Sequence, residues 1–570
     1  MKTTASAAFG ASAVLIPLER ATRSNWAKML EMTRITTRLI FLFGVGMALA
    51  LAADLGAQTP RSYQELLTLW TDFVAFERPP MKNGAPDYSA VTAAARRATL
   101  KTFQSRLAAI DPARWPIDQQ VDHALVAAEM NGLDFDLRVL RPWARDPAFY
   151  QSVWTEQSDT PAHEGPVHHA VVELWMYTFP LSAADDARLA KELATIAPLL
   201  SQARVTLVGQ ARDLWITGTG TMAQQVADLD ALAKDVTTAS ADLKRVIGEA
   251  RTATAEFVQW LERQAPSKTG PSGVGKENYT WSLRHVQLAP MTWDDEVALL
   301  KRELARAHAS LVLEEQRNRG LPQLTPAANA DEYRQRANAA VTKYLAFLKN
   351  KDVLTAQDYL DPALRAHLGG FVPIERRNFF GIASHYEPMT LFAHFFHWFD
   401  HAWMKQAPHA SPIRRGATLF NVWSIRSEGM ATAMEELILH AGYYDDNPRA
   451  KEIVWIMLAQ RCARGLASLY AQANQFDIKQ AKAFQVEWTP RGWMRPDLDL
   501  LNFEQQLYLR QPGYGSSYVT GKYLIDELIK DRAHQLGDAF TLRRFFDEFN
   551  AAGVIPTPLI YWQLTGQRMK

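Results

Sequence analysis

The sequence predicts a mainly α-helical protein with little or no β-sheet. Hydrophobic residues recur at spacings of three and four along most of the chain, which is the pattern of amphipathic helices. No long stretch alternates between apolar and polar residues as a half-buried strand does, and the sequence contains no internal repeat of fixed length. With 570 residues, 48% of them hydrophobic, the chain is long enough for about two to four domains or one large helical body in two halves.

Helical periodicity and helix-breaking residues define the expected elements. We expect helices over residues 62–76, 91–107, 118–140, 183–211, 223–264 (one long helix or two), 293–318 and 330–349. A loop is expected at 265–275, a proline- and glycine-rich boundary at 362–373, and a turn at 510–515 among helices that run from 431 to the end. The predicted regions are an N-terminal extension and signal peptide (1–57), an N-terminal helical region (58–265), a connecting helical region (266–370) and a C-terminal helical region (371–570).

Residues 32–57 have the pattern of a secretory signal peptide. Arg34 and Arg38 precede an apolar run over 39–53, and small residues follow up to Ala57. We therefore expect a secreted or periplasmic protein whose native start is Met32, with an N-terminal membrane anchor as the alternative. The single cysteine, Cys462, excludes an intrachain disulfide. No second segment approaches the length of a membrane span.

The charge balance gives no reason to expect a polyanionic partner. Lys and Arg together number 62 and Asp and Glu 61, for a net charge of +1. Binding to nucleic acid or to an anionic membrane surface requires a basic excess, so neither partner is expected beyond the signal segment. The 17 Trp and 17 Tyr residues are expected mainly in helix packing.

The segment 391–404 has the pattern of a helical metal site. His394, His397 and His401 are spaced i, i+3 and i+7, which places three imidazoles on one arc of a helix. Glu428 and Glu435 lie seven residues apart, again on one helical face. Imidazole and carboxylate groups from two facing helices can build a zinc site, so we predict zinc ligands among these histidines and Glu428. Histidines among Phe and Trp can instead be hydrogen-bonded core residues, but three on one arc favour a metal.

The catalytic base of a zinc peptidase is missing from its usual place. In an H-E-x-x-H motif a glutamate follows the first histidine, whereas this chain has Phe395 there. We consider Asp400, Glu435 and Glu387 as substitutes. A general base contributes about a hundred- to ten-thousandfold, so a site without one would retain little activity.

Three other motifs do not meet the requirements of the sites that they suggest. The segment Gly-Pro-Ser-Gly-Val-Gly-Lys-Glu at 270–277 has Glu277 where a phosphate-binding loop needs Ser or Thr. In 163–169, Val167 takes the place of the second metal-binding His, and Gly-Pro at 165–166 would break a helix, so we predict a loop that borders a groove. The segment 513–517 is not a nucleophile elbow, because its helical setting is wrong for one.

In the motifs of its C-terminal third, the chain resembles the bacterial DUF885 family, helical proteins related to zinc-dependent peptidases. Residues 428–435 resemble the family's E-G-W-A-L-Y-x-E, and Arg461-Cys-Ala-Arg464 resembles R-x-x-R. Residues 512–521 are similar to P-G-Q-A-x-S-Y-x-x-G, 536–556 to L-G-x-x-F-x-L-x-x-F-H-D…G-x-x-P, and 275–279 to G-K-E-x-Y. The resemblance is strongest over 425–560.

The resemblance implies a zincin-like helical body in two halves around a central groove. Aligned with the family motif H-E-x-x-P-G-H, His394 matches the first histidine, Phe395 replaces the glutamate, and His401 falls one residue beyond the last histidine. Glu428 and His394 would be zinc ligands, and either His397 or His401 would complete the set. Phe546 stands where the family usually has histidine.

The function predicted from these residues is an exported zinc peptidase that hydrolyses short peptides. The candidate catalytic residues are Asp400, Glu435 and Tyr518, whose hydroxyl would polarise a carbonyl or stabilise an oxyanion. The candidate substrate-binding residues are Tyr514, Arg510 and Trp398. The alternative is an inactive descendant that binds peptide or metal, and a tryptophan-lined carbohydrate-binding protein is a third possibility.

Overall fold

Helix dominates the structure, which confirms the predicted fold class. The computed structural model describes residues 60–161, 164–420 and 424–570. Helix accounts for 68% of the structure and strand for 2%. The signal peptide predicted at 32–57 lies outside the described residues. Among the described helices, none combines the length and the apolar character that a membrane crossing requires.

The N-terminal part contains helices and four two-residue strands. They are α2 (Pro60–Glu77), β1 (Met81–Lys82), β2 (Ala85–Pro86), α3 (Ala90–Ala108), α4 (Ile117–Phe135), η1 (Asp136–Leu140), α5 (Pro142–Arg145), η2 (Pro147–Tyr150), β3 (Val153–Trp154), β4 (Val172–Glu173), η3 (Leu174–Met176), α6 (Ala183–Leu193), α7 (Ile196–Thr206), α8 (Arg212–Asp235), α9 (Ala241–Gln264) and η4 (Ala265–Ser267). The pair β1–β2 is antiparallel and the pair β3–β4 is parallel.

Helix boundaries in this part follow local chemistry. The helical pattern over 183–211 is divided into α6 and α7. In one continuous helix, the ring of Pro198 would clash with the backbone carbonyl of Ala194, four residues earlier. The pattern over 223–264 falls in two helices, α8 and α9. Ser240 caps the second by accepting a hydrogen bond from the Leu243 backbone N–H.

The remainder of the chain is helical up to its last residues. Its elements are α10 (Lys276–His285), α11 (Trp293–Arg317), α12 (Ala330–Asn350), α13 (Leu360–Arg365), η5 (Ile374–Arg376), α14 (Phe379–Tyr386), α15 (Met389–Phe392), η6 (Ala393–Phe395), α16 (Phe396–Gln406), α17 (Ser424–His440), α18 (Ala450–Gln472), α19 (Ile478–Trp488), η7 (Pro490–Gly492), α20 (Leu500–Arg510), α21 (Tyr514–Leu536), η8 (Gly537–Ala539), α22 (Leu542–Ala551) and α23 (Thr557–Thr565). A capping box formed by Thr292 and Asp295 begins α11.

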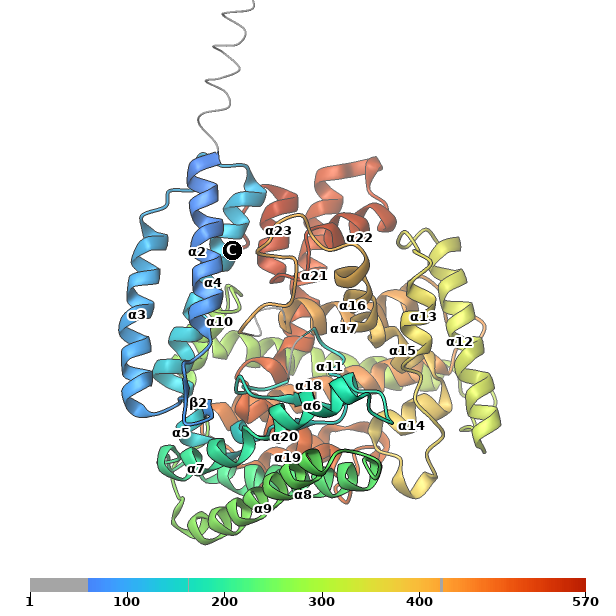
Figure 1. Cartoon of the computed structure of the whole chain (residues 1–570). Coiled ribbons are helices and arrows are strands. Elements are labelled where there is room, and N and C mark those ends of the chain that lie inside the picture. Colours follow the sequence, from blue (N-terminus) through green and yellow to red (C-terminus); the bar gives the residue numbers. More distant parts are fainter. Residues whose placement is uncertain (1–59, 162–163, 421–423) are drawn as a thin grey trace, which may run out of the picture. The chain divides into compact units, whose positions relative to one another are not determined.

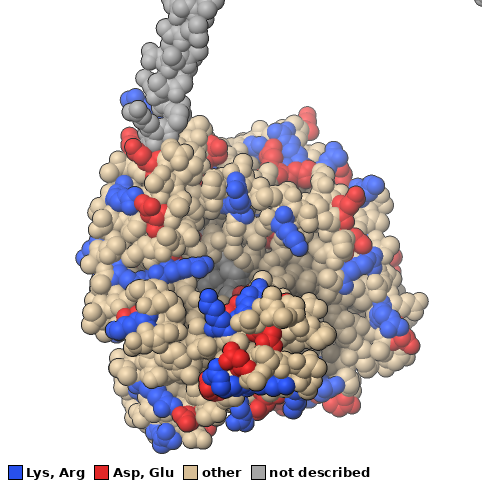
Figure 2. Space-filling view, in the orientation of Figure 1, with Lys and Arg blue, Asp and Glu red and all other residues tan. Residues whose placement is uncertain are grey.

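Residues Glu65–Lys570 form one compact unit. Helices from the predicted regions pack against one another within it, for example α4 against α23 and α8 against α20. The region boundaries at 265 and 370 remain predictions. The helices α17, α18 and α21 lie together and bury most of their residues (Figure 1). On the face drawn in Figure 2, Lys and Arg are interspersed with Asp and Glu, as expected from the balanced net charge.

Candidate metal centre

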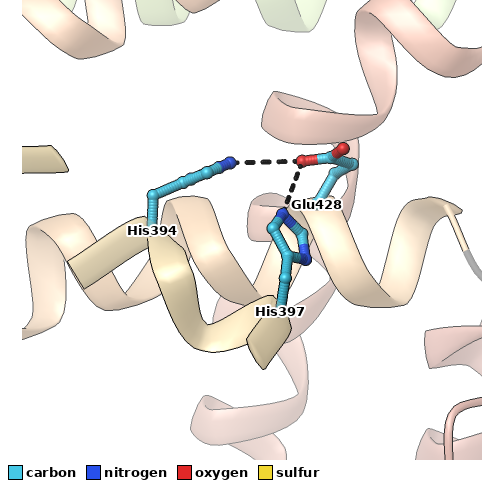
Figure 3. Close-up of side chains that lie close together, drawn as sticks. All are labelled: His394, His397 and Glu428. Atoms are coloured by element: carbon cyan, nitrogen blue, oxygen red, sulfur yellow. Dashed lines mark hydrogen bonds and ion pairs between the residues drawn. The ribbon is translucent and has the colours of Figure 1, made fainter. Parts of the chain in front are cut away.

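Two histidines and one glutamate converge on a common point. The Nε2 atoms of His394 and His397 each lie 3.2 Å from Oε2 of Glu428 (Figure 3). One possible ligand atom from each residue lies within 4.8 Å of the other two, and no other such group of three occurs in the described part of the chain. All three side chains are buried, with His397 0% and Glu428 1% exposed. Two imidazole nitrogens and a carboxylate oxygen are the donor set of a catalytic zinc site.

The histidine-bearing segment contains a break at His394. The sequence predicts one regular helix there, but the structure has the 3₁₀ turn η6 between α15 and α16. His394 lies in that turn and His397 in the first turn of α16, and their ring centroids are 5.0 Å apart at an interplanar angle of 84°. Because a 3₁₀ turn advances about 120° per residue rather than about 100°, the single arc expected for three histidines is not maintained. His401 is not part of the convergent group.

The close approach of two helices positions Glu428. A Cβ atom added at Gly429 would lie 2.5 Å from Cα of Gly521 in α21, so this contact requires glycine. The approach brings the Tyr514 hydroxyl of α21 into hydrogen-bonding contact with Oε1 of Glu428. One carboxylate oxygen therefore accepts from Tyr514, and the other faces both histidines.

A buried ion pair orients His394 from behind. Its Nδ1 lies 2.9 Å from Oε1 of Glu435, and the Arg461 guanidinium donates to both oxygens of that carboxylate. Arg461 Nη2 also lies 3.1 Å from this Nδ1. In the tautomer in which Nδ1 carries the proton and donates it to Glu435, Nε2 keeps its lone pair for a metal. This carboxylate–histidine arrangement is the usual outer shell of a metal-bound imidazole.

The electrostatics favour negative charge on Glu428 and positive charge opposite it. Burial raises the pKa of Glu428, but His397 and His394 outweigh burial and hold it well below its ordinary range. Burial lowers the pKa of His397, yet the Glu428 carboxylate outweighs that effect and raises it to about 9. In the metal-free protein the cluster is therefore a carboxylate facing a protonated imidazole, and a metal ion would displace that proton.

Three further predicted residues lie on α16. Asp400 is buried and forms an ion pair with Arg426. His401 has a buried Nε2 without a hydrogen-bond partner among the described residues, and burial lowers its pKa. Trp398 stacks on the rings of His367 and His401, with centroid distances of 3.3 and 5.1 Å.

The three predicted residues of 510–518 have different surroundings. Tyr514 contacts Glu428, as described above. Tyr518 lies one helical turn later, with its ring stacked 5.8 Å from that of His394 and no hydrogen bond from its hydroxyl within the described residues. Arg510 is buried and donates from Nε to Asp146 over 2.6 Å. Glu387, in the connection between α14 and α15, accepts from Asn447 over 2.8 Å.

A family profile described as "Bacterial protein of unknown function (DUF885)" matches residues 75–367, more than half of the chain. The chain belongs to the DUF885 family. Of the motifs that suggested this family, only residues 275–279 lie inside the matched range, and the others are C-terminal to it. No curated protein matches the sequence.

Two solved structures share the fold of this DUF885 protein. One is described as "a putative lipoprotein of unknown function" from Shewanella oneidensis, with a TM-score of 0.66 and 14% identity over 89% of this chain and 100% of its own. The other is described as "the putative lipoprotein" from Colwellia psychrerythraea, with a TM-score of 0.55 and 13% identity over 84% of this chain and 91% of its own. At these identities the likeness concerns the fold alone.

The structure places one further acidic residue, Glu164, near this site. Tyr514 belongs to the 512–521 motif, and its hydroxyl lies 3.2 Å from Oε1 of Glu164 as well as in contact with Glu428. The sequence predicts a loop bordering a groove at 163–169, but no motif in it assigns a role to Glu164. A glutamate directly before Gly165-Pro166 was the available signal, because a glycine–proline turn can hold a side chain at a defined place.

Proposed function

We propose that this DUF885 protein is an exported zinc-dependent peptidase that acts on short peptides. The observation that carries the proposal is the convergence of His394 Nε2, His397 Nε2 and Glu428 Oε2 in a buried site. A buried carboxylate is costly unless paired, and here the carboxylate and both imidazoles face one another at distances that an intervening cation would suit.

The partners of His394 support its role as a zinc ligand. Glu435 and Arg461 hold His394 Nδ1, so that Nε2 faces Glu428. When bound, zinc supplies Lewis-acid polarisation of a carbonyl and lowers the pKa of water. Three protein ligands leave the fourth position of a tetrahedral zinc site for a reactant.

Tyr518 is the proposed donor to the substrate carbonyl. Its ring is held between that of His394 at 5.8 Å and the Arg464 guanidinium at 3.8 Å, and its hydroxyl has no partner in the described structure. A hydroxyl held in this way can donate a hydrogen bond to the oxygen on which negative charge develops during attack. The lack of an internal partner supports this role, since the donor is not already occupied.

Export is proposed from the leader pattern at 32–57 and from the descriptions of the two structural neighbours. Those neighbours are described as lipoproteins, but this chain has one cysteine, Cys462, which is buried in α18.

Metal analysis combined with peptide hydrolysis tests the proposal. The purified protein is expected to contain about one equivalent of zinc and to cleave members of a short-peptide library. A chelator should stop cleavage and added zinc should restore it. His394→Ala should lose both zinc and cleavage, whereas His308→Ala, which removes a histidine of α11 that contacts the Trp488 carbonyl, should lose neither. Cleavage that persists without metal would rule out the proposal.

The replacement of the usual base by Phe395 favours a second candidate, an inactive descendant that binds peptide or metal. Phe395 is partly buried and stacks on Phe392 at 5.3 Å, so it offers no proton acceptor. This candidate predicts stoichiometric zinc and saturable peptide binding without cleavage, and the same two measurements distinguish it from the peptidase.

A further inference from the structure

We propose that Glu164, on the loop between β3 and β4, is the residue that exchanges protons with the substrate in this site. The inference rests on the peptidase function proposed above and names the acid–base residue that the sequence lacks at position 395. Glu164 reaches the site from the N-terminal part of the chain, about 260 residues before Glu428 in sequence.

Hydrogen-bond counting places a proton on Glu164. The Tyr514 hydroxyl contacts Oε1 of Glu428 and lies 3.2 Å from Oε1 of Glu164. A hydroxyl has one proton, and the closer Glu428 receives it. The second contact is then favourable only if Glu164 is protonated and donates to the tyrosine oxygen, because a second carboxylate there would face a lone pair. The order of donors is Glu164 to Tyr514 to Glu428.

The surroundings of Glu164 agree with that order. Burial raises the pKa of its carboxyl to about 8, and the negative charges of Asp159 and Glu428 act in the same direction. Glu428, which accepts from Tyr514 and faces two imidazoles, is the ionised partner. Unlike Glu428, Glu164 is partly exposed, so a substrate can reach it.

The loop is built to hold this side chain in place. Immediately after Glu164, the backbone turns at Gly165, whose φ of +78° lies in the left-handed region that favours glycine. The Gly165 N–H donates to Gln511 Oε1 over 2.7 Å, and Arg510 donates from Nη2 to the Pro166 carbonyl over 2.9 Å. Arg510 is itself fixed by Asp146. Arg510 and Gln511 are therefore positioning residues for Glu164.

The proposed step balances without a further reactant. The oxygen of water forms a bond to the peptide carbonyl carbon as the carbon–nitrogen bond breaks. Glu164 gives the proton that it holds to the departing amide nitrogen, and the carboxylate that this leaves accepts the proton that the water releases. The products are a carboxylic acid and an amine, and Glu164 returns to its starting state.

Infrared difference spectroscopy and kinetics test the inference together. In the metal-free protein at pH 6.5, we expect a protonated carboxylic acid signal that Glu164→Gln removes and Glu164→Asp shifts. In the zinc-loaded protein, Glu164→Gln should lower kcat about 100- to 10,000-fold, with zinc content and KM little changed. Glu164→Asp should recover part of the rate and retain a pH-dependent limb in kcat that Glu164→Gln lacks. Glu173→Gln, on the neighbouring β4, is the control and should change none of these.

The possible failures are distinguishable. If the wild-type protein cleaves peptides and Glu164→Gln cleaves them equally well, or if the infrared signal persists in that variant, the role of Glu164 is wrong and the peptidase proposal stands. If the wild-type protein binds no zinc, or if a chelator does not change its cleavage rate, the peptidase proposal is wrong and so is the role of Glu164. Melting curves of both Glu164 variants verify that the fold is intact.

Discussion

Replacing Glu428 with glutamine should weaken zinc binding by an amount that depends on pH. The variant keeps the size of the side chain and an oxygen for the Tyr514 hydroxyl, but loses the charged ligand that faces both imidazoles. Zinc sites with four protein ligands gain roughly 10–16 kcal/mol on binding, which is about 3–4 kcal/mol per ligand. A loss of that size corresponds to an affinity about 100- to 1,000-fold lower.

Proton competition reduces this difference near neutral pH. The pKa of His397 is raised to about 9 by Glu428, so at pH 7.5 zinc must displace a proton from the wild-type site at a cost of about 2 kcal/mol. Without the carboxylate, burial lowers the pKa of His397 and the variant does not bear this cost. We therefore expect the variant to bind about three- to thirtyfold more weakly than the wild type at pH 7.5, and about 100- to 1,000-fold more weakly at pH 9.

Zinc titration against a competing chelator at both pH values measures these affinities. Glu436→Gln is the matched control: it removes another buried carboxylate of α17, which pairs with Arg306 over 2.7 Å, and should leave zinc affinity unchanged. A wild-type affinity that does not rise between pH 7.5 and 9, or equal affinities of the wild type and Glu428→Gln at both pH values, would contradict the ligand assignment.

Three other outcomes can be checked. Glu435→Gln should lower zinc affinity about 10- to 100-fold while leaving all three ligands in place, because it loosens the partner of His394 Nδ1; the same titration measures this. Gly429→Ala should lower the free energy of unfolding by about 1–3 kcal/mol, because the added Cβ would clash with Gly521. Gly248→Ala, where the added Cβ has no neighbour within 4 Å, should not destabilise the protein, and equal melting temperatures of the two variants would contradict the close approach of the helices. Burial raises the pKa of Glu129 from 4.5 to about 8, so the stability that protonated Glu129 contributes is complete below pH 4.5 and is lost as pH rises through 8. Denaturant melts at pH 5 and pH 8 should show the free energy of unfolding fall by as much as about 4 kcal/mol, and Glu129→Gln should reduce that fall.

The helices were predictable because their signals are local. Spacings of three and four, together with Ser, Thr and Pro at the ends, depend on residues about one turn apart. The helices predicted over 91–107, 293–318 and 330–349 are found as α3, α11 and α12. The errors occur where a local break interrupts a pattern. The turn η6 interrupts the apolar run around His394, and no residue in that run identifies the break in advance.

The candidate site was predictable in part. His394, His397 and Glu428 could be named because imidazole and carboxylate side chains at helical spacing in apolar surroundings are costly to bury without a function or a partner. Their outer partners were not named in these roles. Glu164 and Tyr514 are 350 residues apart, and that separation carries no periodicity that a single sequence reveals.

Residue chemistry and local spacing were thus sufficient to establish the helical class and to supply the donor atoms of a metal site. Which donors meet was settled by packing between helices, through the contact of Gly429 with Gly521 and the 3₁₀ turn at His394. The reason is the sequence range of the interactions. A helix forms through hydrogen bonds between residues four positions apart, whereas a site with ligands on η6, α16 and α17 and Tyr514 on α21 depends on contacts between residues 31 to 86 positions apart. These contacts unite His394, His397 and Glu428, and they leave His401 outside the group.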